Sequence, residues 1–168
     1  MAKKSLDARR RHCARRRRSL VAVTSAPLTK DDLLRIYAET KTIAVIGASQ
    51  NVRKAAHEIP RYLHSQGYRT IPVSPKGGEL FGEQIRASLA EIDEQVDVVD
   101  VFRPPAESEA VAQAAIEAGA KVLWFQIGTE SPEAVRLAEA AGLTVVTGSC
   151  MGATHGRLGL GPGPGPHD

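Results

Sequence analysis

The sequence has no long hydrophobic run and almost no cysteine, and these two absences exclude several classes of protein. No apolar stretch approaches the roughly 20 residues that a membrane-spanning helix requires, so we expect a soluble chain with no membrane partner. The two cysteines, Cys13 and Cys150, share no spacing pattern. This argues against a disulfide framework and predicts a reducing compartment, the cytoplasm.

Positive charge is concentrated at one end of the chain. The net charge of +3 hides a segment at residues 1–18 with nine lysine and arginine residues against one acid, Asp7. This segment carries +8 and the rest of the chain −5, so no general nucleic-acid-binding face is expected on the body of the protein. Because residues 1–27 have little apolar content, we expect a disordered tail. A contact with nucleic acid or an acidic partner, or a targeting peptide, are the alternatives for it. Residues 159–168, rich in Gly and Pro, predict a second disordered end.

Between these tails, apolar β-branched runs alternate with helical patterns. Thr29, with Asp32 three residues later, resembles a capping box and predicts a short leading helix. Strands are expected at 42–46, 69–73, 96–102, 122–125 and 143–146, and helices at about 55–66, 107–118 and 132–141, with a short helix after Ser88. Apolar strands that alternate with helices predict an α/β fold, a Rossmann-like doubly wound five-stranded parallel sheet, as a single domain over residues 28–158.

The loop after the first expected strand is a candidate phosphate site, because ligands of open parallel sheets bind beyond the carboxyl ends of the strands. Its candidate ligand residues are Gly47, Ala48, Ser49, Arg53 and Lys54. The glycine permits close approach of the backbone, the serine can donate a hydrogen bond, and the following helix N-terminus favours an anion. Only Gly47 matches the three-glycine dinucleotide fingerprint, so an ordinary turn with two solvated cations remains the alternative.

The loop after the second expected strand contains Pro75 and Lys76 but no acid. An NAD site would place an acid there to bind the ribose hydroxyls. Lys76 instead suits an additional phosphate, such as the one on the ribose of coenzyme A. The alternative is a turn made by Pro75 and the glycines at 77 and 78, with a solvated lysine.

Two further strand ends contribute candidate residues to the same edge of the sheet. Phe102 and Arg103 follow the third strand, and Arg103 is either a phosphate ligand or a charge at the rim. Gln126, Ile127 and Gly128 follow the fourth and supply amide and backbone groups. Buried residues are also expected nearby: Trp124 lies inside its strand and should belong to the core.

Cys150 and His155 follow the fifth strand and could act as nucleophile and base, but the spacing fixes no third group. Two such side chains are too few for a zinc site. His57 and His64 are interpreted as solvated or packing residues of one helix, and Asp97 and Asp100 as forming no paired-carboxylate site. We therefore predict no catalytic residues and no metal.

Five segments occur in order and carry a family resemblance: KTIAVIGAS at 41–49, YRTIPVSPK at 68–76, VDVVDVFRPP at 96–105, GAKVLWFQIG at 119–128 and AGLTVVTGSC at 141–150. With them the chain resembles the stand-alone CoA-binding proteins related to the nucleotide-binding domain of the succinyl-CoA ligase alpha subunit. The resemblance implies a Rossmann-type fold that holds CoA across the strand ends, through the positions of Gly47, Ala48, Ser49, Pro75, Lys76, Phe102, Arg103, Ile127 and Gly128.

The chain departs from this family at two positions. Ser74 stands where the family commonly has Asn, and Thr154 stands where it usually has an acid before the histidine. The ligase subunit carries its phosphorylated histidine in a further domain, so ligation by this chain alone is not expected. The resemblance implies a non-catalytic module that binds or senses coenzyme A or an acyl-CoA. The alternatives are an enzyme acting on acyl-CoA thioesters, part of a split ligase, or an NAD-type redox sensor.

Overall fold

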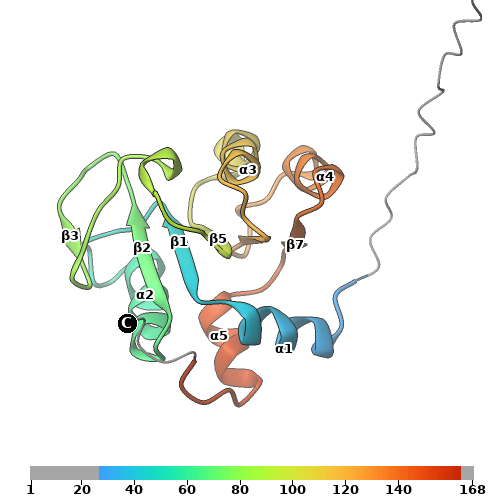
Figure 1. Cartoon of the computed structure of the whole chain (residues 1–168), viewed down its shortest axis with the longest axis horizontal. Coiled ribbons are helices and arrows are strands. Elements are labelled where there is room, and N and C mark those ends of the chain that lie inside the picture. The colour runs from blue at the N-terminus through green and yellow to red at the C-terminus, as the bar shows by residue number, and fades with distance from the viewer. Residues whose placement is uncertain (1–26, 164–168) are drawn as a thin grey trace, which may run out of the picture.

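The protein is built on a parallel five-stranded sheet with the order β2-β1-β5-β6-β7. Figure 1 shows the computed structural model, with β2, β1, β5 and β7 following one another across the sheet. The structure describes residues 27–163. The strands of this sheet are β1 (Thr42–Ile46), β2 (Arg69–Val73), β5 (Val98–Val101), β6 (Val122–Phe125) and β7 (Thr144–Val146). The α-helices are α1 (Lys30–Glu39), α2 (Ala55–Ser65), α3 (Ser108–Glu117), α4 (Pro132–Ala140) and α5 (Met151–Arg157). The predicted α/β fold class is confirmed.

Helices cover both faces of the sheet because each strand alternates its side chains between two apolar cores. In β1, Ile43 and Val45 belong to the core under α1, α2 and α5, whereas Ala44 belongs to the core under α3 and α4. Figure 1 shows α3 and α4 on one side of the sheet and α1 and α5 on the other. Burial on both faces explains why the strands are continuous apolar runs in the sequence.

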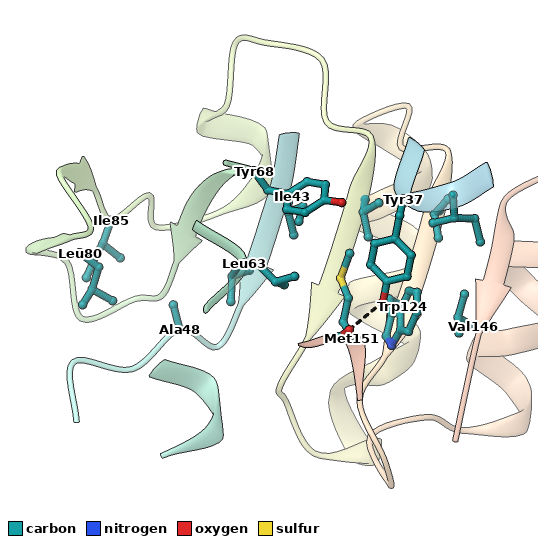
Figure 2. Close-up of a cluster of buried hydrophobic side chains, with 14 residues drawn as sticks. Tyr37, Ile43, Ala48, Leu63, Tyr68, Leu80, Ile85, Trp124, Val146 and Met151 are labelled. Atoms are coloured by element: carbon teal, nitrogen blue, oxygen red, sulfur yellow. Dashed lines mark hydrogen bonds between the residues drawn. The ribbon is translucent and has the colours of Figure 1, made fainter. Parts of the chain in front are cut away.

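The core under α1 and α5 contains the largest buried side chains. Trp124 is fully buried there, which confirms its predicted place in the core. Figure 2 shows it beside Tyr37 and Met151, and the Tyr37 hydroxyl donates a hydrogen bond of 2.7 Å to the Met151 carbonyl oxygen. The ring centroids of Tyr37 and Trp124 lie 5.7 Å apart. This contact joins α1, β6 and the start of α5 into one packed unit.

The predicted capping box at the start of α1 is present. The Thr29 backbone N–H donates to the Asp32 carboxylate at 2.9 Å, and the Asp32 N–H donates to the Thr29 hydroxyl at 3.2 Å. In α4, the Ser131 hydroxyl accepts from the Ala134 N–H at 3.1 Å. Both side chains satisfy backbone donors that a helix N-terminus leaves unpaired.

A two-stranded hairpin and one helix were not predicted from the sequence. The first is a hairpin of β3 (Glu79–Leu80) and β4 (Glu83–Gln84), whose turn holds Phe81 at a φ of 55°. The second is α5, which contains Gly152 and Gly156. A Cβ at Gly152 would lie 3.2 Å from Ile59 Cγ2, so glycine lets α5 approach α2 closely. The short helix expected after Ser88 is a 3-10 turn at Leu89–Glu91.

The ends of the described chain lie near opposite edges of the sheet. Leu160 packs against the core that contains Tyr68, and the Gly163 N–H donates to the Gln66 carbonyl oxygen beside β2. The predictions for residues 1–26 and 164–168 lie outside the described residues, and the domain boundaries remain predictions. Within residues 27–163, no helix combines the length and apolar character needed to cross a membrane.

Candidate functional site

The order of the strands reverses between β1 and β5, which are neighbours in the sheet although β2 lies between them in the chain. Such a reversal opens a crevice at the carboxyl ends of the two strands. Gly47 lies directly after β1, where its N–H donates to the Val73 carbonyl oxygen at 2.9 Å. Its φ is 87°, and the side chain of Arg103 crosses it so closely that a Cβ would lie 2.7 Å from Arg103 Cδ. Glycine is therefore favoured at this point for two separate reasons.

The loop between β1 and α2 is held by its own hydrogen bonds. The Asn51 N–H donates to the Ser49 hydroxyl at 3.2 Å, and the Arg53 N–H donates to the Asn51 side-chain oxygen at 3.0 Å. Lys54 is the N-cap residue of α2 and supplies no side-chain hydrogen bond to the helix. The Lys54 and His57 N–H groups donate to the Asn51 and Lys54 carbonyl oxygens at 3.0 and 2.9 Å. Because no side chain caps this N-terminus, the Ala55 and Ala56 N–H groups are available to an anion.

His57 fixes this loop from the side of the helix. Its Nδ1–H donates to the Ser49 carbonyl oxygen at 2.8 Å, and its ring centroid lies 5.2 Å from that of Phe81 in the hairpin turn. The imidazole is buried, which confirms that it packs and is not solvated. Its contact with Ser49 was missed in the sequence, although its position in the first turn of the helix places it beside the preceding loop.

The loop after β2 faces the first loop. The Ser74 N–H donates to the Arg86 carbonyl oxygen at 2.9 Å, and the Ser74 hydroxyl accepts from the Lys76 N–H at 3.4 Å. A Cβ at Gly78 would lie 2.6 Å from Gln50 Nε2, so the two loops touch. The backbone around Lys76 is thereby fixed beside the loop that precedes α2.

These loops enclose a cleft of about 350 Å³. Of the predicted site residues, the cleft brings together Gly47, Ala48, Ser49, Lys54, Lys76, Phe102 and Arg103. Arg53, Pro75, Gln126, Ile127 and Gly128 are not among its lining residues. A larger hollow of about 660 Å³ runs along β7, but no lysine or arginine lines it, so it offers no cation to a phosphate. We therefore place the candidate site at the smaller cleft.

Arg103 has an acidic partner at the rim of this cleft. Its Nε and Nη2 donate to the two carboxylate oxygens of Glu107 at 2.8 and 2.6 Å. The hydrogen bonds with Arg103 hold the pKa of the Glu107 carboxyl below its usual value. Glu107 closes a 3-10 turn at Pro105–Glu107.

The turn after β6 divides its residues between the interior and the surface. Gln126 is buried, and its amide nitrogen donates to Asp100 Oδ1 at 2.7 Å. Ile127 is 69% exposed, and the Thr129 N–H closes the turn by donating to the Gln126 carbonyl oxygen at 3.0 Å. Burial raises the pKa of Asp100 to about 7, although its hydrogen bonds with Gln126 and the Val101 backbone lower it. The Gln126 side chain is thus engaged inside the protein, and its role as a ligand residue stays a prediction.

His155 is fully buried among aromatic rings. Its Nδ1 lies 3.0 Å from the Tyr62 hydroxyl, and the ring centroids of Tyr37 and Tyr68 lie 5.3 and 5.6 Å from its own. Burial lowers the pKa of His155. The described residues contain no hydrogen bond between this imidazole and Cys150, so the geometry supplies no activated thiol. In the same range, no three His, Cys, Asp or Glu side chains could jointly hold a metal ion.

Comparison with known proteins gives one consistent family. A model of the CoA binding domain matches residues 41–156. The uncharacterized protein YneT of Bacillus subtilis (strain 168) is 33% identical over 127 residues, which are 76% of this chain and 94% of YneT. A hypothetical protein of known structure from Pyrococcus horikoshii OT3 is 37% identical, with a TM-score of 0.77 over 80% of this chain and 96% of that one.

A larger enzyme shares part of the same region. The ADP-forming acetate–CoA ligase of Methanocaldococcus jannaschii is 27% identical over 75 residues. These are 45% of this chain but only 11% of the ligase. The likeness therefore concerns one region of that enzyme and leaves most of its length without a counterpart here.

Proposed function

Because this chain belongs to the CoA-binding domain family, we propose that its cleft binds coenzyme A or an acyl-CoA as a non-catalytic binding or sensing module. The observation that carries the proposal is the convergence of Lys54, Lys76 and Arg103 on one cleft at the start of α2. Three cations and a helix N-terminus suit a ligand with several phosphate groups. Family membership also agrees with the resemblance found in the sequence.

The parts of the ligand can be assigned to the parts of the cleft. The diphosphate lies over Gly47 and Ser49 at the N-terminus of α2, where the backbone approaches it closely. Lys76 binds the phosphate on the ribose. The pantetheine arm extends past Phe102 along the strand ends towards Ile127 and Gly128. These two residues follow β6, which lies two strands, or about 10 Å, from β1. Arg53 and Pro75 follow β1 and β2 and stay predicted ligand residues.

Lys76 provides the sharpest test of the assignment. We expect the Lys76→Gln protein to bind CoA about fivefold more weakly in calorimetry, because one cation near a phosphate is worth about 1 kcal/mol in water. Dephospho-CoA lacks the ribose phosphate, so wild type and Lys76→Gln should bind it with the same affinity. Lys41→Gln is the matched control, since Lys41 is an exposed lysine at the other end of β1. If wild-type protein gives no heat with either CoA or acetyl-CoA, the proposed function is wrong.

The ligase likeness favours one second candidate, a chain that acts on acyl-CoA thioesters or forms part of a split ligase. Cys150 would then be the nucleophile. Equal rates of acyl-CoA hydrolysis by wild type and Cys150→Ala would exclude this role. An NAD-type sensor is the weaker alternative, because residues 74–78 supply no acid for the ribose hydroxyls.

A further inference from the structure

Glu107 is an acid at the rim of a cleft that is otherwise suited to anions. Both of its carboxylate oxygens accept hydrogen bonds from Arg103, at 2.6 and 2.8 Å. The two side chains remain 40% and 44% exposed, so a ligand can reach them. The geometry is the bidentate one that a phosphate group would itself adopt with a guanidinium.

Both partners are held in place by the surrounding backbone. The stem of Arg103 lies against Gly47, where a Cβ would lie 2.7 Å from Arg103 Cδ. Glu107 ends a turn that begins at Pro105, and its N–H donates to the Pro104 carbonyl oxygen at 2.9 Å. The pair is therefore part of the architecture of the cleft.

The other cations of the cleft lack such a partner. Lys54 and Lys76 line the same space, and within the described residues neither forms an ion pair with an acid. Arg103 alone among the three is neutralised at short range. A ligand phosphate thus finds two available cations and one that is already occupied.

We propose that Glu107 is a specificity-determining residue, which competes with ligand phosphate for the Arg103 guanidinium. The inference rests on the proposed binding of CoA. A phosphate can bind the Nε and Nη2 groups of Arg103 only if the Glu107 carboxylate first releases them. An isolated phosphate cannot offset that loss, whereas a ligand already anchored at Lys54, Lys76 and α2 can. The cleft therefore selects nucleotides with several phosphate groups over inorganic phosphate.

The test is the affinity of Glu107→Gln for CoA and for inorganic phosphate, measured by calorimetry. We expect both affinities to rise at least about threefold, with the larger gain for inorganic phosphate, because the neutral amide competes poorly for the guanidinium. Glu109→Gln removes the same charge from an exposed position in the first turn of α3 and should leave both affinities unchanged. Damage to the fold would lower affinity, so a gain cannot be mistaken for it.

A double substitution shows whether the effect passes through Arg103. In an Arg103→Gln background, adding Glu107→Gln should give little further gain. The inference is overturned if Glu107→Gln behaves like Glu109→Gln, or if its full gain persists without Arg103. CoA binding by wild type with an unchanged affinity in Glu107→Gln removes this inference alone, whereas no CoA binding by wild type removes the proposed function as well.

Discussion

Replacing Gly47 with alanine should damage the protein in two separable ways. The first is conformational, because the φ of 87° costs an alanine about 1 kcal/mol relative to glycine. The second is steric, since the new Cβ would lie 2.7 Å from Arg103 Cδ and 3.3 Å from the Phe102 carbonyl carbon. Crowding of this kind typically costs a further 1 to 2 kcal/mol. We expect a total loss of about 2 to 3 kcal/mol in the free energy of unfolding, together with weaker CoA binding.

Gly119→Ala separates the two contributions. Gly119 has a φ of 68°, and nothing lies within 4 Å of a Cβ built there, so this variant should lose only the conformational part, about 1 kcal/mol. Urea denaturation measures both variants, and calorimetry with CoA measures the site. A loss of stability in Gly47→Ala no larger than that in Gly119→Ala would contradict a steric contribution from Arg103. So would a double variant, Gly47→Ala/Arg103→Ala, in which the shortened side chain recovers none of the difference.

Two further predictions concern stability alone. Asp100→Asn should be more stable than wild type at pH 8 by roughly 1 to 3 kcal/mol and should lose this advantage near pH 4. The reason is that a carboxyl with a raised pKa destabilises the folded state as pH rises from about 4 to about 7. Urea denaturation at both pH values measures this, and equal stabilities at pH 8 would contradict it. Thr29→Ala should cost about 1 kcal/mol through loss of the capping box. If the midpoint of urea denaturation is the same for Thr29→Ala as for wild type, then α1 opens before the rest of the domain.

Much of the sheet could be predicted because its strands are buried on both faces. The predicted ranges 42–46, 69–73 and 122–125 coincide with β1, β2 and β6. The third strand was expected at 96–102 but pairs only over Val98–Val101. Val96 is buried and extends the apolar pattern. At Asp97 the backbone N–H still donates to the Thr42 carbonyl oxygen at 3.0 Å, and the carboxylate accepts from the Lys41 and Thr42 N–H groups. A run of apolar residues indicates burial, but it does not indicate at which residue an assigned strand begins.

The elements that were missed have weak local signals. Phe81 is an unusual residue for a turn with positive φ, and it is accommodated there because its ring packs on His57 and His64. The two glycines of α5 lower its intrinsic helix propensity. The close contact between Gly152 and Ile59 compensates, but it joins segments far apart in the sequence. Neither contact could be read from local pattern.

The candidate site was predictable at the level of strand ends but not of side-chain direction. The rule for open sheets placed the residues after β1, β2 and β5 together, and seven of the predicted residues line one cleft. The same rule does not predict the direction of the Gln126 side chain, which points inward to Asp100. Gln126 lies two residues after Trp124, and the alternation of strand side chains could have indicated that it shares the same buried face.

The reversal between β1 and β5 also has a consequence for biosynthesis. During translation, β1, α2 and β2 leave the ribosome before β5, and the two strands can pair because they are joined through a single helix. The other edge of β1 stays unpaired until β5 has been made. Phe102 and Arg103 follow β5, so the nascent chain carries the loop between β1 and α2 before the opposite wall of the cleft exists. A ligand that needs both walls can therefore stabilise only chains whose synthesis has passed β5.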